Sequence, residues 1–150
     1  MHTGVTPTTA PSDTATLEVN TRYNINATAA RAYRVPAAAA SRAGDWISLI
    51  YTVDIANEVV HSYTTTTDAN YSIGSAIIIP GQDGTRVGVV DLSGTDDNIL
   101  TITGASNGDG GRGTIINFRN MTGELNGWAV EAIIQGQGTQ AVASASTAFS

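Results

Sequence analysis

The stretch LEVNTRYNIN, residues 17–26, alternates apolar or large side chains with polar ones along its whole length. A period of two places successive side chains on opposite faces of an extended chain, so this stretch predicts a half-buried β-strand. The stretch DWISLIYTV, residues 45–53, also indicates a strand, with Ile47, Leu49, Tyr51 and Val53 on one face and Trp46 and Ile50 on the other, so either one face or both faces are covered. Together the two stretches favour an all-β fold.

Further strands are expected along the rest of the chain, separated by turn sequences at intervals of about ten residues. They are expected at 33–35, 58–65, 71–79, 86–92, 99–103, 114–119 and 128–134. In the last of these, Trp128, Val130, Ala132 and Ile134 share one face. The Asn126-Gly127 pair is a hairpin signal, and it predicts that the last two of these strands pair antiparallel. Only AAAASRA, residues 37–43, has helical character, for one or two turns at most. The spacing of strands at about ten residues is typical of a sandwich or a barrel.

The length of 150 residues suits one domain with a single core. Residues 1–16 are rich in Thr, Pro and Ala, and we interpret them as a flexible or extended N-terminal arm. The β domain then covers residues 17–150. Within it, residues 136–150 are small and polar, and they form either an edge strand or a C-terminal arm.

Charge and composition exclude several classes of function. The chain has no cysteine, which excludes disulfides, Cys-ligated zinc and thiol catalysis. Its formal net charge is -6, and all seven cationic residues are arginines. A surface that follows nucleic-acid phosphates needs a cationic patch, so we expect no nucleic-acid partner and no binding to anionic membranes.

The charge is unevenly distributed along the chain. Residues 1–50 carry four arginines against three acids, a net charge of +1, whereas residues 51–150 carry three arginines against ten acids, a net charge of -7. The four arginines of the first part are Arg22, Arg31, Arg34 and Arg42. They are either ordinary solvated side chains or a docking surface for an acidic partner.

No cofactor or metal site is expected. Residues 108–113 match the spacing GxGxxG, but the following TIINF is β-branched and offers no helix N-terminus for a pyrophosphate. The oxygen-bearing residues at 96–98 and 107–109 lack the spacing of a calcium loop, so we interpret them as turns without metal. The only histidines are His2, in the expected arm, and His61, which we expect to be partly exposed on a strand.

We expect no enzymatic activity, because two histidines without a nucleophile motif do not make a hydrolytic triad. A pair of catalytic carboxylates could come from three candidates that qualify by residue type alone, namely Glu124, Glu131 and Asp91. The two tryptophans, Trp46 and Trp128, stand among aliphatic residues within strands, which favours burial over a platform for stacking sugars.

Several short motifs follow one another in a suggestive order. They are VPAAAA at 35–40, AGDW at 43–46, TGASNGD at 103–109 and GWAVE at 127–131. In this order they resemble the small β-rich head-decoration (cement) proteins of tailed bacteriophages and, more loosely, the β domains of phage tail and fibre proteins.

The resemblance implies a jelly-roll-like sandwich or barrel, a homotrimer, and a place on the capsid exterior of the virion. The partner would be the major capsid protein, which the decoration protein holds together without catalysis. Residues 1–16 and the four arginines would dock on the capsid, while the acidic remainder faces solvent. One alternative is a tail-fibre or knob domain that binds a host carbohydrate or receptor through an exposed Trp46 or a tyrosine. A small secreted β-sandwich hydrolase is the other.

Overall fold

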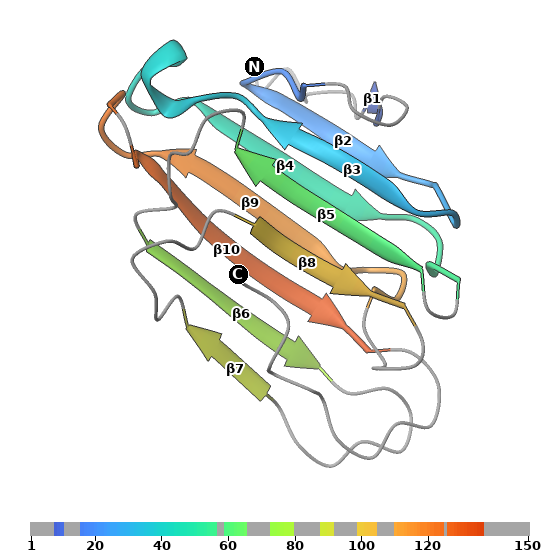
Figure 1. The fold of residues 1–150 in the computed structure, drawn as a ribbon. Helices are drawn as coiled ribbons and strands as arrows, with labels where there is room; N and C mark the ends of the chain where they lie inside the picture. Colours follow the sequence, from blue (N-terminus) through green and yellow to red (C-terminus); the bar gives the residue numbers. More distant parts are fainter. Residues whose placement is uncertain are drawn as a thin grey trace, which may run out of the picture.

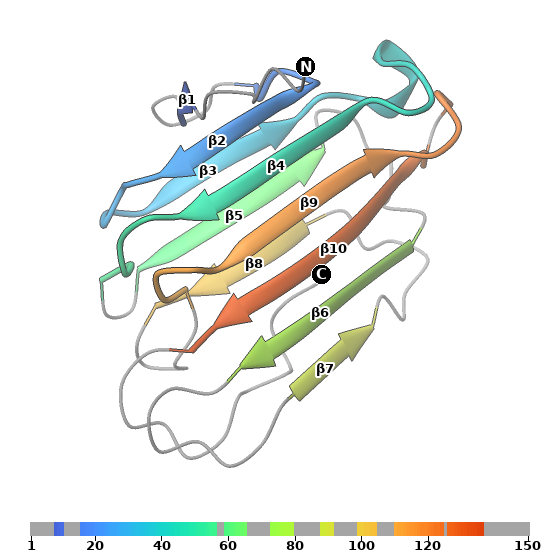
Figure 2. The ribbon, with the colours of Figure 1, turned by 180° about the vertical axis from the view of Figure 1, so that it is seen from behind.

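The computed structural model describes residues 8–10, 16–56, 59–65, 73–79, 88–91, 99–104, 110–124 and 126–136. In these residues the chain forms two β-sheets that pack face to face (Figures 1 and 2). The all-β sandwich that the alternation predicts is therefore confirmed.

The larger sheet has seven strands and the smaller has three. In spatial order the large sheet contains β1 (Thr8–Thr9), β2 (Thr21–Ile25), β4 (Trp46–Tyr51), β9 (Ile115–Asn120), β10 (Trp128–Gln135), β6 (Ile73–Ile79) and β7 (Gly88–Asp91). The small sheet contains β3 (Arg31–Val35), β5 (Val60–Thr65) and β8 (Ile99–Thr103).

The first half of the chain winds back and forth between the sheets. β2 lies in the large sheet, β3 in the small sheet, β4 beside β2 and β5 beside β3, and both neighbouring pairs are parallel. β1 adds to β2 in the same parallel sense. Because each strand crosses to the opposite sheet before the chain returns, strands themselves serve as the crossover connections that parallel pairing requires.

The second half adds mainly antiparallel strands. β9 pairs with β4 and β10, β7 with β6, and β8 with β5, all antiparallel, whereas β10 and β6 are parallel. A jelly roll is built from antiparallel strands. Because four of the eight ladders described are parallel, the jelly-roll arrangement is not confirmed.

The core lies between the two sheets and follows the predicted alternation. Strand β4 buries Ile47, Leu49 and Tyr51, and β2 buries Tyr23 and Ile25. Strand β10 buries every second side chain from its first residue, namely Trp128, Val130, Ala132 and Ile134. Period two therefore identified the inward face of these strands correctly.

The expected helical segment is only a single 3₁₀ turn, η1 (Ala38–Ala40). No side chain caps its start, and its one buried residue is Ala38. A turn this short gains little from helical hydrogen bonding, so packing of Ala38 decides its position.

Asn126-Gly127 lies between β9 and β10, and the two strands are antiparallel as predicted. The connection spans residues 121–127 and is closed by a hydrogen bond from the Met121 N–H to the Gly127 carbonyl at 2.7 Å. Asn126 has φ 60°. At Gly127 a β-carbon would lie 2.8 Å from the backbone carbonyl oxygen of Glu124, so only glycine fits.

Where it is described, the expected N-terminal arm pairs with this chain's own sheets. Thr8 and Thr9 extend the large sheet, while Thr16 forms a bridge with Arg34 at the edge of the small one. The Leu17 N–H then donates to the Arg34 carbonyl at 2.8 Å. The rest of that arm, and the expected C-terminal arm or edge strand after Gly136, lie outside the described residues.

Candidate functional site

The outer face of the large sheet carries an exposed row of isoleucines. The strand register pairs Ile50 with Ile115, Ile115 with Ile133, and Ile133 with Ile77, so the row crosses β4, β9, β10 and β6. Ile133 and Ile77 are 44% and 41% exposed, while Ile50 and Ile115 are half-buried. We call these four residues the isoleucine row.

A polar row lies two residues away along the strands. Arg22, Ser48, Asn117, Glu131 and Ser75 are successive partners across β2, β4, β9, β10 and β6. Arg22, Asn117 and Glu131 are exposed. The outer face therefore changes from apolar to polar over one step of the pleat.

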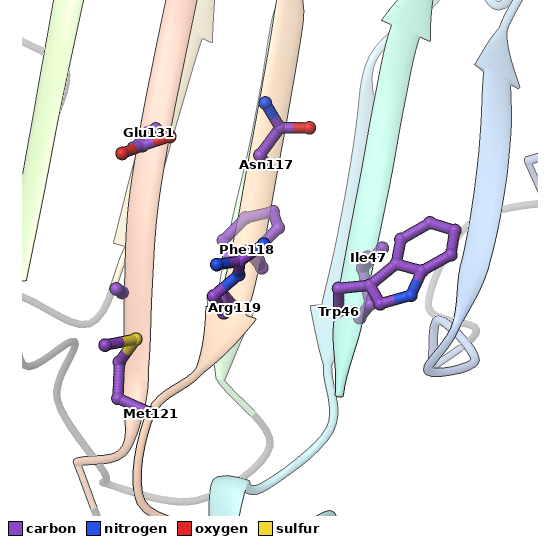
Figure 3. Close-up of a pocket in the computed structure, with 8 residues that line it drawn as sticks. Trp46, Ile47, Asn117, Phe118, Arg119, Met121 and Glu131 are labelled. Carbon is purple, nitrogen blue, oxygen red and sulfur yellow. The ribbon is translucent and has the colours of Figure 1, made fainter. Parts of the chain in front are cut away.

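Starting at Asn117 and Glu131 of the polar row, the same face is hollowed into an open groove of about 570 Å³. We call it the Trp46 groove. Its outward-facing residues are Trp46, Asn117, Arg119, Met121, Ala129 and Glu131, and Ile47 and Phe118 line it from behind the sheet (Figure 3). The register pairs Trp46 with Arg119 and Arg119 with Ala129. The small Ala129 side chain leaves space between the longer ones.

Three polar side chains of the groove have no bonding partner within the described residues. Across the described part of the chain, no hydrogen bond or ion pair involves the side chains of Asn117, Arg119 or Glu131. Trp46 is half-buried, whereas Trp128 is 1% exposed. Burial is thus confirmed in full for Trp128 and only in part for Trp46.

The sandwich interior contains a polar cluster of Tyr51, His61 and Tyr63. The Tyr51 hydroxyl lies 2.8 Å from the Tyr63 hydroxyl and 3.1 Å from the His61 Nδ1. The His61 Nε2 lies 2.9 Å from the Ala29 carbonyl. The ring of Tyr33 stacks on that of Tyr63 at 5.1 Å. Each buried polar group therefore has a partner, as burial requires.

The expectation that His61 is partly exposed is wrong. Its side chain is completely buried, because β5 turns this residue inward between the sheets. Both ring nitrogens lie within hydrogen-bonding distance of protein atoms, so the ring is held in place and closed to solvent. The cluster holds the two sheets together, since Tyr51 belongs to the large sheet and His61 to the small one.

Stability is expected to fall at alkaline pH because of Tyr51. Burial raises the pKa of Tyr51 above its ordinary value of 10.0, although the hydrogen bond with Tyr63 acts in the opposite direction. Above that value the unfolded chain releases this proton while the folded chain keeps it, so the free energy of unfolding decreases by about 1.4 kcal/mol per pH unit. Urea unfolding from about pH 9 to about pH 11 measures the slope. A Tyr51→Phe variant should show a shallower slope, and equal slopes would contradict the assignment.

The four arginines do not form one patch. Arg22 points outward from the large sheet and Arg34 from the small sheet, on opposite sides of the sandwich. Arg31 begins β3, and Arg42 follows η1 at the other end of that strand (Figure 1). Their docking role stays a prediction, and only Arg22 lies on the face with the isoleucine row.

The glycine-rich loop has a backbone role where it is described. Gly110 and Gly113 have φ of 74° and 94°, as expected for glycines that serve positive φ. A β-carbon on Gly110 would lie 2.5 Å from the Cγ1 of Ile55. Strand β9 follows directly, so no helix N-terminus faces the loop. His2 and the residues at 96–98 and 107–109 fall outside the described part.

The described residues contain no cluster of three His, Cys, Asp or Glu side chains that could hold a metal ion. In the same residues, no helix has the length and apolar character to cross a lipid bilayer. The isoleucine row and the Trp46 groove were missed from the sequence because their members come from distant strands. Comparison of the chain with protein-family models, curated proteins and solved structures finds no match.

Proposed function

We propose that the protein is a non-enzymatic capsid decoration protein of a tailed bacteriophage. It docks on the outer surface of the major capsid shell and stabilises that shell, acting as a homotrimer. The observation that carries this proposal is the isoleucine row on the outer face of the large sheet. The resemblance to head-decoration proteins supplies the identity of the partner.

An exposed row of aliphatic side chains supports docking on another protein. Contiguous apolar patches on soluble proteins mark interaction sites, and this one is bordered by a polar row. Fully burying an isoleucine contributes roughly 1.5–3 kcal/mol, and Ile133 and Ile77 have about two fifths of their surface left to bury. One copy therefore gains modest affinity, and a trimer that engages several sites at once gains much more.

This proposal moves the docking surface from the N-terminal arm to the sheet. Thr8, Thr9 and Thr16 already pair with this chain's own strands. Arg22 lies in the polar row, beside the edge of the isoleucine row, where it can face an acidic group on the shell. The acidic remainder of the chain is left to face solvent.

The test is binding of purified protein to undecorated phage heads. We expect the wild-type chain to sediment with the heads and to raise their resistance to heat. Ile133→Asp should weaken binding by at least about tenfold, because it places a charge in a surface that must lose water. Far-UV circular dichroism and a melting curve confirm that the variant is folded.

The matched control is Val60→Asp. Val60 is 39% exposed, a fraction similar to the 44% of Ile133, but it lies on β5 in the small sheet. We expect this variant to bind heads like the wild type. Equal binding by Ile133→Asp and the wild type would remove the isoleucine row from the interface, and no binding by the wild type would refute the decoration function.

A further inference from the structure

We propose that the Trp46 groove binds a neutral oligosaccharide. This inference goes beyond docking on a capsid and depends on different residues. It comes from one arrangement: a half-buried indole at one side of the groove and, across from it, three polar side chains that have no partner among the described residues.

Trp46 provides a flat apolar surface at one side of the groove. Its indole lies beside β4 on the side of β2, with the plane of its rings turned outward (Figure 3). Its backbone is held by the start of β2, since the Trp46 N–H donates to the Asn20 Oδ1 at 3.4 Å and the Asn20 N–H donates to the Trp46 carbonyl at 2.6 Å. The apolar face of a sugar ring can stack on such a platform.

The other side of the groove offers hydrogen-bonding groups of both kinds. Arg119 donates only, Glu131 as a carboxylate accepts only, and Asn117 does both. Hydroxyl groups of a sugar donate and accept, so they can use all three residues. Pockets that orient small ligands combine an apolar surface with a few such groups.

The charge of the groove favours a neutral ligand. Arg119 and Glu131 carry opposite charges, and no salt bridge joins them within the described residues. The chain as a whole has a net charge of -6, which disfavours anionic ligands.

The length of the groove favours more than one sugar ring. The strands that carry the platform and the carboxylate, β4 and β10, are two strand spacings apart, about 10 Å. A chain of sugars laid across the strands spans that distance. The polar row that holds Asn117 and Glu131 lies about 7 Å along the strands from the isoleucine row.

The experiment applies the full-length protein to an array that carries neutral and sialylated glycans. We expect binding to neutral oligosaccharides and weaker or no binding to the sialylated forms. Acrylamide quenching follows, because Trp46 is accessible while Trp128 is buried. The bound oligosaccharide should protect the quenchable part of the fluorescence.

Three variants in the groove and one control outside it assign the site. Trp46→Ala and Glu131→Gln should each raise the Kd of the neutral oligosaccharide about tenfold, the loss of one stacking surface or one charged hydrogen bond. Trp46→Tyr should restore part of the affinity, since it restores a flat ring. Ile133→Asp, on the same face but outside the groove, should leave this Kd unchanged.

The two proposals fail separately. Head binding that is lost in Ile133→Asp while the array shows no neutral glycan leaves the decoration function standing and refutes the groove. Binding of a neutral glycan without binding to heads refutes the decoration function and leaves the groove proposal standing. Binding confined to sialylated glycans, or unaffected by both Trp46→Ala and Glu131→Gln, would also overturn the proposed site.

Discussion

Replacing Trp128 by alanine is expected to lower the free energy of unfolding by about 3–5 kcal/mol. The side chain is 1% exposed and belongs to the core between the sheets. Its Nε1–H also donates to the Pro36 carbonyl at 2.7 Å, and Pro36 directly follows β3 of the small sheet. Truncation thus leaves a cavity and an unpaired carbonyl at a point where the two sheets are joined.

Urea unfolding monitored by circular dichroism measures this loss. The control is Trp46→Ala, which changes the same residue type on the outer face of β4. We expect a loss of less than about 1 kcal/mol there, as for other surface positions. A similar loss in both variants would contradict the different roles that we assign to the two tryptophans.

Replacing Asn120 by alanine is expected to lower the free energy of unfolding by about 2–4 kcal/mol, since a buried amide that makes three hydrogen bonds is lost and the partly buried N–H groups of Thr122 and Gly123 lose their acceptor. Asn120 is 1% exposed at the end of β9. Its Nδ2 donates to the Ala38 carbonyl of η1 at 2.8 Å. Its Oδ1 accepts hydrogen bonds from the N–H groups of Gly123 at 2.7 Å and Thr122 at 3.2 Å. One amide therefore orders both the β9–β10 connection and the 3₁₀ turn.

Two further variants make this prediction specific. Asn117→Ala, three residues earlier and on the opposite, exposed face of β9, should change the free energy of unfolding by less than about 0.5 kcal/mol. Asn120→Asp keeps the acceptor but places a carboxylate against the Ala38 carbonyl, so we expect at least the loss seen for alanine. A stable Asn120→Asp protein at neutral pH would contradict the donor role of Nδ2.

The residues discussed above fall into two groups: those that stabilise the fold and those that remain open to ligands. Trp128, Asn120 and the Tyr51 cluster have their polar atoms bonded within the protein. Trp46 and Arg119 lie on the same sheet, but on its outer face. The proposed decoration function needs both groups of residues, because the sandwich must stay folded while its surface exchanges water for a partner.

The sequence alone determined the longer strands, though not β1, and the inward faces of several of them. Alternation is a local property: neighbours in the chain point to opposite sides whatever the rest of the molecule does. For this reason the buried faces of β2, β4 and β10 were predicted correctly. The local signal also placed the antiparallel pair β9 and β10, which is joined by a short connection.

Only the tertiary structure decided which distant strands become neighbours. The parallel pairs between β2 and β4 and between β10 and β6 join segments with other strands between them in the chain, and no local pattern specifies that choice. Burial of His61 follows from the same cause, since its partner Tyr51 comes from the opposite sheet. The isoleucine row and the Trp46 groove exist only in the assembled register, because side chains far apart in sequence meet on one face when the strands align.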